Sequence, residues 1–426
     1  ANNFKVPNSK DFNNPTGWDK IEEDFKFAAD NLTETKTQIG RANSWAAKAF
    51  LAKTYMQRAK LEDAKPLLDD IILNGVTASG IKYDLETDYS KLFRTGFKNG
   101  AESVFAVQMS VNDQGRNGNE GEPFNYPPWY PKAGGWGHMP SFNLVNAYKT
   151  QGGLPMFDNF NDVDVKNNFG QNVTLDTFVP DAGPLDPRLD WTVGRFGLPY
   201  HDYGRMNQAY NTDNAVYYGK KWVVFSSDAT ELIEGWKQMS AINYPMIRFA
   251  DVLLWAAECE VEIGDINKAL GYVNRVRTRA ALPSGFLKTY VDNADPSKGF
   301  TNTPAANYVI STYPSFPDKA YARKAVRFER RLELATEGHR FFDLQRFDRI
   351  DEKYGNESGY MARVLNDYME QEAQRWVTYL GPNMPHGFLT GRNFVKGKHE
   401  VYCIPQEQID LSKTGNELTL TQNPGF

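Results

Sequence analysis

The sequence predicts a mainly α-helical protein, a scaffold of tetratricopeptide-like helical repeats that carries long irregular aromatic loops and a few short strands. Three observations lead to this prediction. Two pairs of helical segments repeat the same small and apolar positions, and a third segment near residue 330 has a strong helical period. The chain between them is rich in Gly, Pro, Asn and aromatic residues and shows little regular periodicity.

The helical segments begin close to the N-terminus. Residues 18–31 place apolar side chains on one face of a helix. A first helical pair follows at residues 44–58 and 62–73, and a second pair is predicted at residues 251–262 and 266–279. A glycine ends the first pair, and another separates the two helices of the second pair.

The two pairs share an internal spacing. A small residue in the first helix is followed 12 residues later by a small residue that opens the second helix, and 7 residues after that by an apolar one: Ala52, Ala64 and Ile71, then Ala257, Ala269 and Val276. Antiparallel helices approach closely only where the side chains at their crossing are small. This spacing is typical of tetratricopeptide repeats, and generic helical hairpins are the alternative.

The third helical segment covers residues 326–347, VRFERRLELATEGHRFFDLQRF. Its apolar side chains form one stripe with helical spacing: Ala325, Phe328, Leu332 and Ala335. Charged residues flank this stripe: Arg327, Glu329, Arg330, Arg331, Glu333 and Glu337. Gly338 offers a left-handed residue to end the helix, and residues 339–347 resume it. We expect an amphipathic helix docked on a core, then a corner at which His339 is a partly buried structural residue.

The region between the helical pairs, about residues 101–240, is irregular. Residues 103–111 read as a strand, and a long loop follows at residues 114–141. A loop of this length is usually functional or disordered, and its large aromatic rings argue against disorder. A second aromatic cluster lies further along the chain: Trp191, Phe196, Tyr200, Tyr203, Tyr217, Tyr218 and Trp222.

Aromatic loops with polar neighbours suit a carbohydrate ligand. A flat ring covers the apolar C–H face of a sugar, while amide, carboxylate and guanidinium groups bond its hydroxyls. The aromatic candidates for such a site are Trp129, Tyr130, Trp136 and Tyr203, and the polar candidates are Asp113, Arg116 and Asn117. For any single ring, local packing is the alternative interpretation.

Composition and motifs exclude several functions. The net charge is −5 and no basic block occurs, so nucleic acid is not an expected partner. The five histidines are scattered, and neither a zinc motif, a nucleophile elbow nor a phosphate loop is present. We therefore expect no enzyme activity, catalytic residue, metal or cofactor. Cys259 and Cys403 are expected to be free, buried thiols.

Acidic residues leave two weaker alternatives open. The pairs Glu120 with Glu122 and Asp158 with Asp162 could serve a glycoside hydrolase, although sequence spacing does not fix the separation of two carboxylates. An oxygen-rich loop comprises Asp158, Asn161, Asp162 and Asp164. It lacks the glycine and the terminal glutamate of an EF-hand, so a solvated acidic loop is favoured over a calcium site.

The run ERRLELATEGHRFFDLQRF resembles the signature of the SusD/RagB family, the surface glycan-binding lipoproteins of Bacteroidetes. Residues 40–75, 244–280 and 404–426 resemble further family segments in the same order. The resemblance implies one SusD-like body over residues 1–426, with helical pairs at about 18–75, 244–280 and 320–349, the loop-rich ligand-binding region at 101–240, and a C-terminal segment at 350–426.

The resemblance also implies a function. A SusD-like protein would bind an oligosaccharide or polysaccharide at the cell surface without cleaving it and deliver it to a SusC-like TonB-dependent transporter of the outer membrane. The resemblance implies that a lipid anchor, which is absent from this sequence, would hold it there. Family members also carry a further N-terminal region before the point at which this sequence begins. The alternatives are a tetratricopeptide-type protein-interaction scaffold and a receptor for a non-sugar nutrient.

Overall fold

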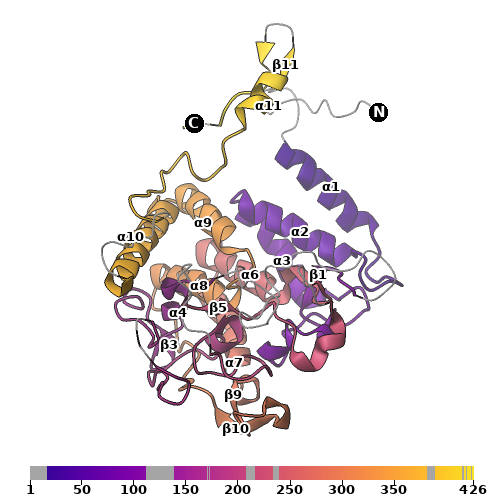
Figure 1. The fold of residues 1–426 in the computed structure, drawn as a ribbon. Helices are drawn as coiled ribbons and strands as arrows, with labels where there is room; N and C mark the ends of the chain where they lie inside the picture. Colours follow the sequence, from indigo (N-terminus) through magenta and orange to yellow (C-terminus); the bar gives the residue numbers. More distant parts are fainter. Residues whose placement is uncertain are drawn as a thin grey trace.

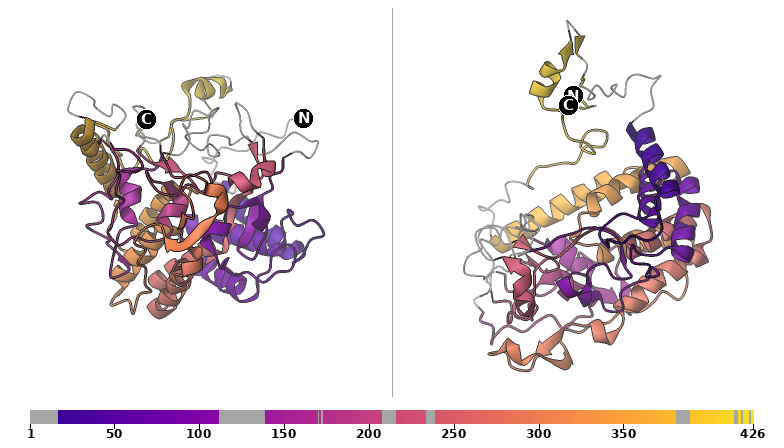
Figure 2. Two further views of the ribbon diagram at one scale, coloured as in Figure 1. Left: turned by 60° about the horizontal axis from the view of Figure 1, so that its bottom comes forward. Right: turned by 90° about the vertical axis from the view of Figure 1, so that its right-hand side faces the viewer.

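The computed structural model describes residues 17–111, 139–169, 171, 173–207, 216–233, 239–380, 389–414, 417–418, 420–423 and 425–426. Its long helices stack against one another in the upper part of the body in Figure 1, and the irregular segments lie below them. In the right-hand view of Figure 2 the irregular segments lie on the opposite side from the N-terminal helices. The mainly helical fold predicted from the sequence is therefore confirmed.

The first helical pair is α2 (Ser44–Gln57) and α3 (Leu61–Asn74), and α1 (Gly17–Asn31) packs against α2. The side chain of Asn43 caps α2 by accepting a hydrogen bond from the backbone N–H of Ala46 at 2.8 Å. The small residues Ala52 and Ala64, which the spacing placed at the crossing, are fully buried. Their lack of bulk lets the two helices approach closely.

The second pair is α6 (Phe249–Ile263) and α7 (Ile266–Ala280), and α6 occupies the centre of the body. Every residue of α6 except the last is buried, because α3, α7 and α8 all pack against it. Burial extends to three glutamates of α6, each of which meets a cation from another helix. Glu258 pairs with Arg346, Glu260 with Lys65, and Glu262 with Arg323.

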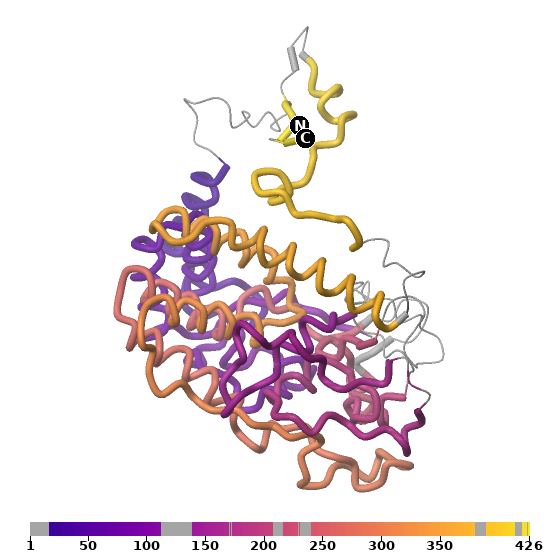
Figure 3. Tube along the Cα trace, turned by 90° about the vertical axis from the view of Figure 1, so that its left-hand side faces the viewer, coloured from indigo at the N-terminus to yellow at the C-terminus, as the bar shows by residue number. Residues whose placement is uncertain are grey.

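The third helical segment forms α8 (Lys319–Glu333) and α9 (Arg340–Tyr354). Gly338 has a φ of +81° in the turn between them, as the sequence predicted. His339 is partly buried next to Asp251 at this corner. A further long helix, α10 (Tyr360–Leu380), was not predicted and crosses above the body in Figure 3. The described C-terminal residues extend away from the body and carry α11 (Gln406–Leu411).

Strands are short and occur in antiparallel pairs. β1 (Ser103–Val107) pairs with β8 (Tyr244–Arg248), so the predicted strand at residues 103–111 ends earlier than expected. The other pairs are β2 (Thr150–Gln151) with β3 (Leu154–Pro155), β4 (Val193–Gly194) with β5 (Tyr218–Gly219), β6 (Leu232–Ile233) with β7 (Met239–Ser240), β9 (Lys288–Tyr290) with β10 (Phe300–Pro304), and β11 (Lys413–Thr414) with β12 (Glu417–Leu418).

Short helical turns connect the loop segments. Two of them have α-helical hydrogen bonding, namely α4 (Phe142–Ala147) and α5 (Leu189–Thr192). The remainder are 3₁₀ turns: η1 (Tyr89–Lys91), η2 (Thr95–Phe97), η4 (Ser226–Glu231), η5 (Pro283–Gly285) and η6 (Pro296–Lys298). Within the described ranges, no helix is both long and apolar enough to cross a membrane.

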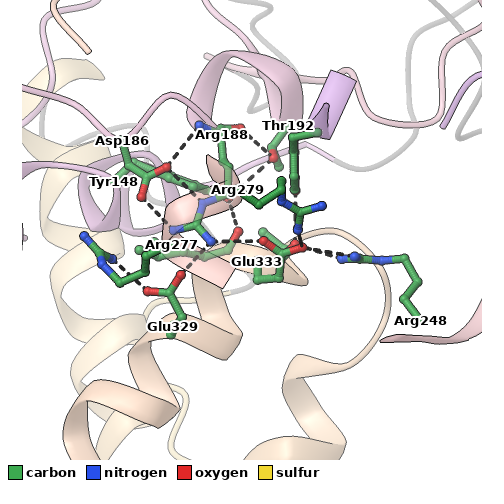
Figure 4. Close-up of polar contacts among 12 residues, drawn as sticks. Tyr148, Asp186, Arg188, Thr192, Arg248, Arg277, Arg279, Glu329 and Glu333 are labelled. Carbon is green, nitrogen blue, oxygen red and sulfur yellow. Dashed lines mark hydrogen bonds and ion pairs between the residues drawn. The ribbon is translucent and has the colours of Figure 1, made fainter. Parts of the chain in front are cut away.

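A buried network of ion pairs holds α8 in place (Figure 4). Arg188, from α5's entry loop, donates to Glu329 at 2.7 Å and to Glu333 at 3.0 Å. Glu333 also accepts from Arg248 at 3.0 Å and from Arg279, while Glu329 accepts from Arg277 at 2.8 Å. Arginines from three segments that are distant in sequence therefore meet on two carboxylates of one helix.

This network corrects one expectation. The charged residues of α8 were predicted to flank the apolar stripe as a polar surface, but Glu329, Arg330 and Glu333 are at most 1% exposed. The apolar stripe itself is buried as predicted. Both faces of α8 are therefore largely interior over its C-terminal half. A buried charge is tolerated only when it is paired and hydrogen-bonded, and each of these residues meets partners from other elements.

The two cysteines are free, but only one matches the expectation of burial. Cys259 lies in the core on α6, where burial raises the pKa of its thiol well above the ordinary value. Cys403 is exposed on the C-terminal segment. The prediction of a buried thiol at Cys403 is therefore wrong, because this segment runs outside the helical body.

Glu333→Gln tests the network. Removing one carboxylate leaves Arg188, Arg248 and Arg279 buried without their shared partner, so we expect the free energy of unfolding to fall by about 3–5 kcal/mol. Denaturant unfolding measures this loss. The control, Glu23→Gln, breaks an exposed pair with Lys20 and should leave stability unchanged. Equal stability of the two variants would contradict the account.

Acid unfolding tests the same network by its charge. Burial alone would raise the pKa of Glu337, but Arg248 and Lys221 outweigh burial and hold that pKa at about 2. The unfolded value is about 4.3, so the stabilisation is complete above that pH and is lost as the pH falls toward 2. We expect the denaturant midpoint to fall steeply between about pH 4.5 and pH 2, and a flat profile would contradict this.

Candidate functional site

The sequence-predicted site residues fall mostly in one segment. Trp129, Tyr130, Trp136, Asp113, Arg116 and Asn117 all belong to residues 112–138, which lie outside the described part of the chain. Tyr203 is the seventh and lies within it. The position of the segment is nevertheless marked at its two ends, by Val111 after β1 and by Met139 before α4.

Tyr203 is partly buried in a loop. Its hydroxyl donates a hydrogen bond to the carbonyl of Val224 at 2.8 Å. Its ring packs against a small apolar cluster made of Tyr200, Met206, Tyr218 and Val223, and Met139 packs against the same cluster. Met139 is the first described residue after residues 112–138. Tyr203 and the first described residue after position 138 therefore pack on one cluster.

The other rings of the second aromatic cluster are mostly interior. Phe196, Tyr200, Tyr217, Tyr218 and Trp222 are buried. Trp222 shows why: its indole stacks on Tyr244 with 5.4 Å between ring centres and donates to the carbonyl of Thr336 at 2.9 Å. Trp191, which is partly buried, donates to the carbonyl of Gly285 at 2.7 Å. Local packing is the correct interpretation for these rings.

Buried cations fasten the loops to one another. Lys220 donates to the carbonyls of Asp190 at 2.6 Å and Pro199 at 2.8 Å, and burial lowers its pKa to about 7. Lys221 donates to the carbonyl of Ala335 at 2.7 Å and pairs with Glu337 at 2.8 Å. The loop around Tyr203 is thus tied to the turn that follows α8. A binding surface built on it would be held rigidly.

Two aspartates of the acidic loop near residue 160 are paired with cations of the protein, and Asp162 is exposed. Asp158 pairs with Lys324 at 2.8 Å, and Asp164 accepts from Arg375 at 2.6 Å and from the hydroxyl of Tyr379 at 2.9 Å. Among the residues that the structure describes, no group of three or more His, Cys, Asp or Glu side chains is arranged to hold a metal ion. The loop serves to anchor α10.

Two adjoining cavities lie between α4, α8, α9 and α10. The larger has a volume of about 480 Å³ and the smaller about 240 Å³. Both are lined by the same five residues at their boundary: Asn143, Arg331, Arg340, Val364 and Tyr368. Glu372 of α10 fixes the wall by accepting the backbone N–H groups of Phe142 and Asn143, and burial raises its pKa to about 7.

The larger cavity combines aromatic rings with hydrogen-bonding groups. Its rings are Phe157, Phe160, Phe328, Tyr360 and Tyr368, and its polar wall includes Asn143, Asn161, Asn356 and Gln371. Concave sites with a few convergent polar groups among apolar walls are typical of small-molecule binding. The sequence analysis did not identify this site because it did not predict α10. Apolar residues at helical spacing signalled that helix: Met361, Val364, Leu365, Tyr368 and Trp376.

Comparison with known sequences connects the fold to one family. The SusD family profile matches residues 101–426. A SusD-like protein of Bacteroides ovatus is 38% identical over 99 residues, which cover 21% of this chain and 17% of that protein. SusD-like protein P2 of Formosa agariphila is 24% identical over 354 residues, or 79% of this chain and 57% of that protein. The chain therefore spans well under two thirds of the length of either relative.

Solved structures share the fold at low sequence identity. A SusD superfamily protein of Bacteroides vulgatus is 21% identical, has a TM-score of 0.61, and is matched over 95% of this chain and 67% of that one. Surface glycan-binding protein A of Bacteroides fluxus is 17% identical, has a TM-score of 0.60, and is matched over 96% of this chain and 69% of that one. A laminarin-binding SusD-like protein is 19% identical, has a TM-score of 0.53, and is matched over 96% of this chain and 68% of that one.

Trp222→Ala tests the assignment of the second aromatic cluster to the core. The change empties a buried indole site and removes the hydrogen bond to Thr336, so we expect a loss of about 3–5 kcal/mol in the free energy of unfolding. Tyr203→Phe keeps the ring and removes one hydroxyl, and should cost about 1 kcal/mol. Denaturant unfolding compares the two. Trp222→Ala at wild-type stability would show that this ring is not a core residue.

Proposed function

The chain belongs to the SusD family, and from this premise we propose that it binds an oligosaccharide or polysaccharide without cleaving it. The binding surface would be the one formed by the loop-rich region, residues 101–240, which we call the loop face. We propose further that it passes the bound glycan to a SusC-like TonB-dependent transporter. Its place would be the outer surface of the outer membrane, where a lipid anchor would hold it.

The family match carries this proposal. It extends over residues 101–426, which include the loop-rich region as well as the helical body. Two structural neighbours with the same fold are described as laminarin-binding and surface glycan-binding proteins. A fold alone does not determine a ligand, so the choice of glycan rests on the residues of the loop face.

We propose that the binding residues are Trp129, Tyr130, Trp136 and Tyr203, with Asp113, Arg116 and Asn117 as hydrogen-bonding groups. This proposal is supported by Met139, the first described residue after position 138, which packs on the same apolar cluster as Tyr203. Because the hydroxyl of Tyr203 is already bonded to Val224, this residue would contribute its ring rather than a hydrogen bond. The sugar would lie on a rigid base, since Lys220 and Lys221 fasten the neighbouring loops.

The division of labour between helices and loops supports delivery to a partner. Stacked helices with a complete ion-pair network form a rigid body that can dock on another protein. Loops on one side of that body can change ligand without disturbing the core. The transporter role is tested by co-purification of this chain with its membrane partner.

Affinity electrophoresis of the purified chain against plant, host and microbial polysaccharides tests glycan binding. We expect one glycan class to retard the protein without release of reducing ends. The double variant Trp129→Ala with Trp136→Ala should weaken that binding by about tenfold or more, a loss of at least about 1.4 kcal/mol, with little change in the thermal midpoint. The control is Tyr402→Ala, which removes a ring that is 86% exposed on the C-terminal segment.

Three results would contradict the proposal. Wild-type binding by the double variant would remove these rings from the site. Release of reducing sugar by pure protein would indicate a glycoside hydrolase. Absence of binding to every glycan would favour a receptor for a non-sugar nutrient or a protein-interaction scaffold.

A further inference from the structure

The smaller cavity has an excess of positive charge. Three arginines line it, namely Arg330, Arg331 and Arg340, and Asp343 is the single acidic residue among them. Arg330 is matched, because it pairs with Asp343 at 2.9 Å and with Asp251 at 3.0 Å. The charges of Arg331 and Arg340 are not matched by Asp343, which is shared instead between Arg330 and Arg346.

Arg331 has neutral partners. Its guanidinium donates to the backbone carbonyl of Asn143 at 3.0 Å and to the side-chain oxygen of the same residue. The guanidinium also lies near two aromatic rings, that of Phe160 at 4.9 Å and that of Phe328 at 5.9 Å. Burial, and after it the positive charge of Arg340, lowers the pKa of Arg331 to about 9. The structure therefore holds this cation where its charge is poorly stabilised.

Arg340 is the second unmatched cation. It is the first residue of α9 and lines both cavities. Within the described ranges it makes no hydrogen bond or ion pair, although its neighbours in α8 and α9 are almost all paired. A long charged side chain on a cavity wall, with no partner of its own, is available to a ligand.

Two residues of the smaller cavity each carry a buried polar atom that lacks a hydrogen-bond partner among the described residues. One atom is the hydroxyl of Thr336, a residue of the turn between α8 and α9 whose φ of +65° is strained for a residue that is not glycine. The other atom is Nη1, a terminal nitrogen of Arg330 on α8. Both residues line the smaller cavity. Buried polar atoms of this kind usually have a partner, and a bound ligand would supply one.

We propose that the smaller cavity binds the anionic group of an acidic sugar, a carboxylate or a sulfate ester, between Arg331 and Arg340. This inference rests on the proposed function and specifies its substrate class as an acidic glycan. Guanidinium groups suit both anions because they donate two parallel hydrogen bonds to a pair of oxygen atoms on one anionic group. Leu144, Leu334 and Val364 supply apolar wall for the sugar ring.

The smaller cavity lies close to the cluster that holds Tyr203. Ser141, which lines the cavity, stands two residues after Met139, and Met139 packs on that cluster. A glycan chain can therefore place one acidic sugar unit in the cavity while another unit lies near Tyr203. The two arginines would make binding selective for a negatively charged sugar.

Calorimetry and affinity electrophoresis with three polymers test this inference: polygalacturonate carries carboxylates, dextran sulfate carries sulfate esters, and amylose is neutral. Wild type should bind one of the two acidic polymers, and Arg340→Gln should weaken that binding by about tenfold or more. The thermal midpoint of Arg340→Gln should stay close to the wild-type value, because this side chain makes no hydrogen bond or ion pair within the described ranges.

The matched control is Arg363→Gln. Arg363 lines the larger cavity, but its charge is already paired with Glu357 at 2.6 Å. Its removal should change binding of the acidic polymer less than twofold. If Arg363→Gln weakens binding as much as Arg340→Gln does, general electrostatic attraction explains the affinity and the proposed pocket is wrong.

The remaining outcomes separate this inference from the proposed function. Binding of amylose alone, or equal binding of an acidic polymer by wild type and Arg340→Gln, would overturn the acidic pocket and leave glycan binding intact. If no polymer binds, titration with galacturonate and with inorganic sulfate tests whether the cavity itself binds an anion. Arg340-dependent binding of either small anion would keep the pocket while the proposed function fails, and no binding would reject both.

Discussion

The buried ion pairs of α8 are the constraint on which the rest of the structure depends. Glu329 and Glu333 accept hydrogen bonds from arginines of the loop before α5, the end of β8 and α7 (Figure 4). Buried charges are costly unless every partner is present. The helical pairs and the loop-rich region must therefore take one relative arrangement, in which each arginine reaches its carboxylate. Apolar packing alone would tolerate a small shift of α8, whereas this network does not.

The same constraint gives the loops their rigidity. The turn after α8 is held by Lys221 and by Glu337, and the loop around Tyr203 is connected to that turn through the neighbouring Lys220. The two cavities open along α8 and the start of α9, where, among the described residues, Arg331 and Arg340 make no ion pair with a carboxylate. The arginines that join α8 to the core are paired with carboxylates, whereas these two, one on α8 and one on α9, are not. We consider this contrast the main physical evidence for a ligand at the cavity.

Sequence reasoning succeeded where the signal was local. Small residues at fixed spacing located both helical pairs, and Gly338 located the corner after α8, because each depends on nearby residues. Sequence reasoning failed at Glu329 and Glu333, which resemble surface charges in the sequence. Their burial depends on arginines up to 145 residues away along the chain, and a local pattern does not reveal such contacts. Sequence reasoning also did not predict α10, although this segment contains apolar residues at helical spacing. The cavities could not be foreseen without that helix, and the proposed aromatic residues lie mainly in residues 112–138.

The central claim is that this protein holds a glycan on its loop face beside Arg331 and Arg340, and does not cleave it. A crystal structure of the complex with an acidic oligosaccharide tests this most directly. The account predicts an intact chain that contacts residues 112–138 and places one anionic group between the two guanidinium groups. A sugar bound on another face of the helical body, or a cleaved product in the cavity, would contradict it.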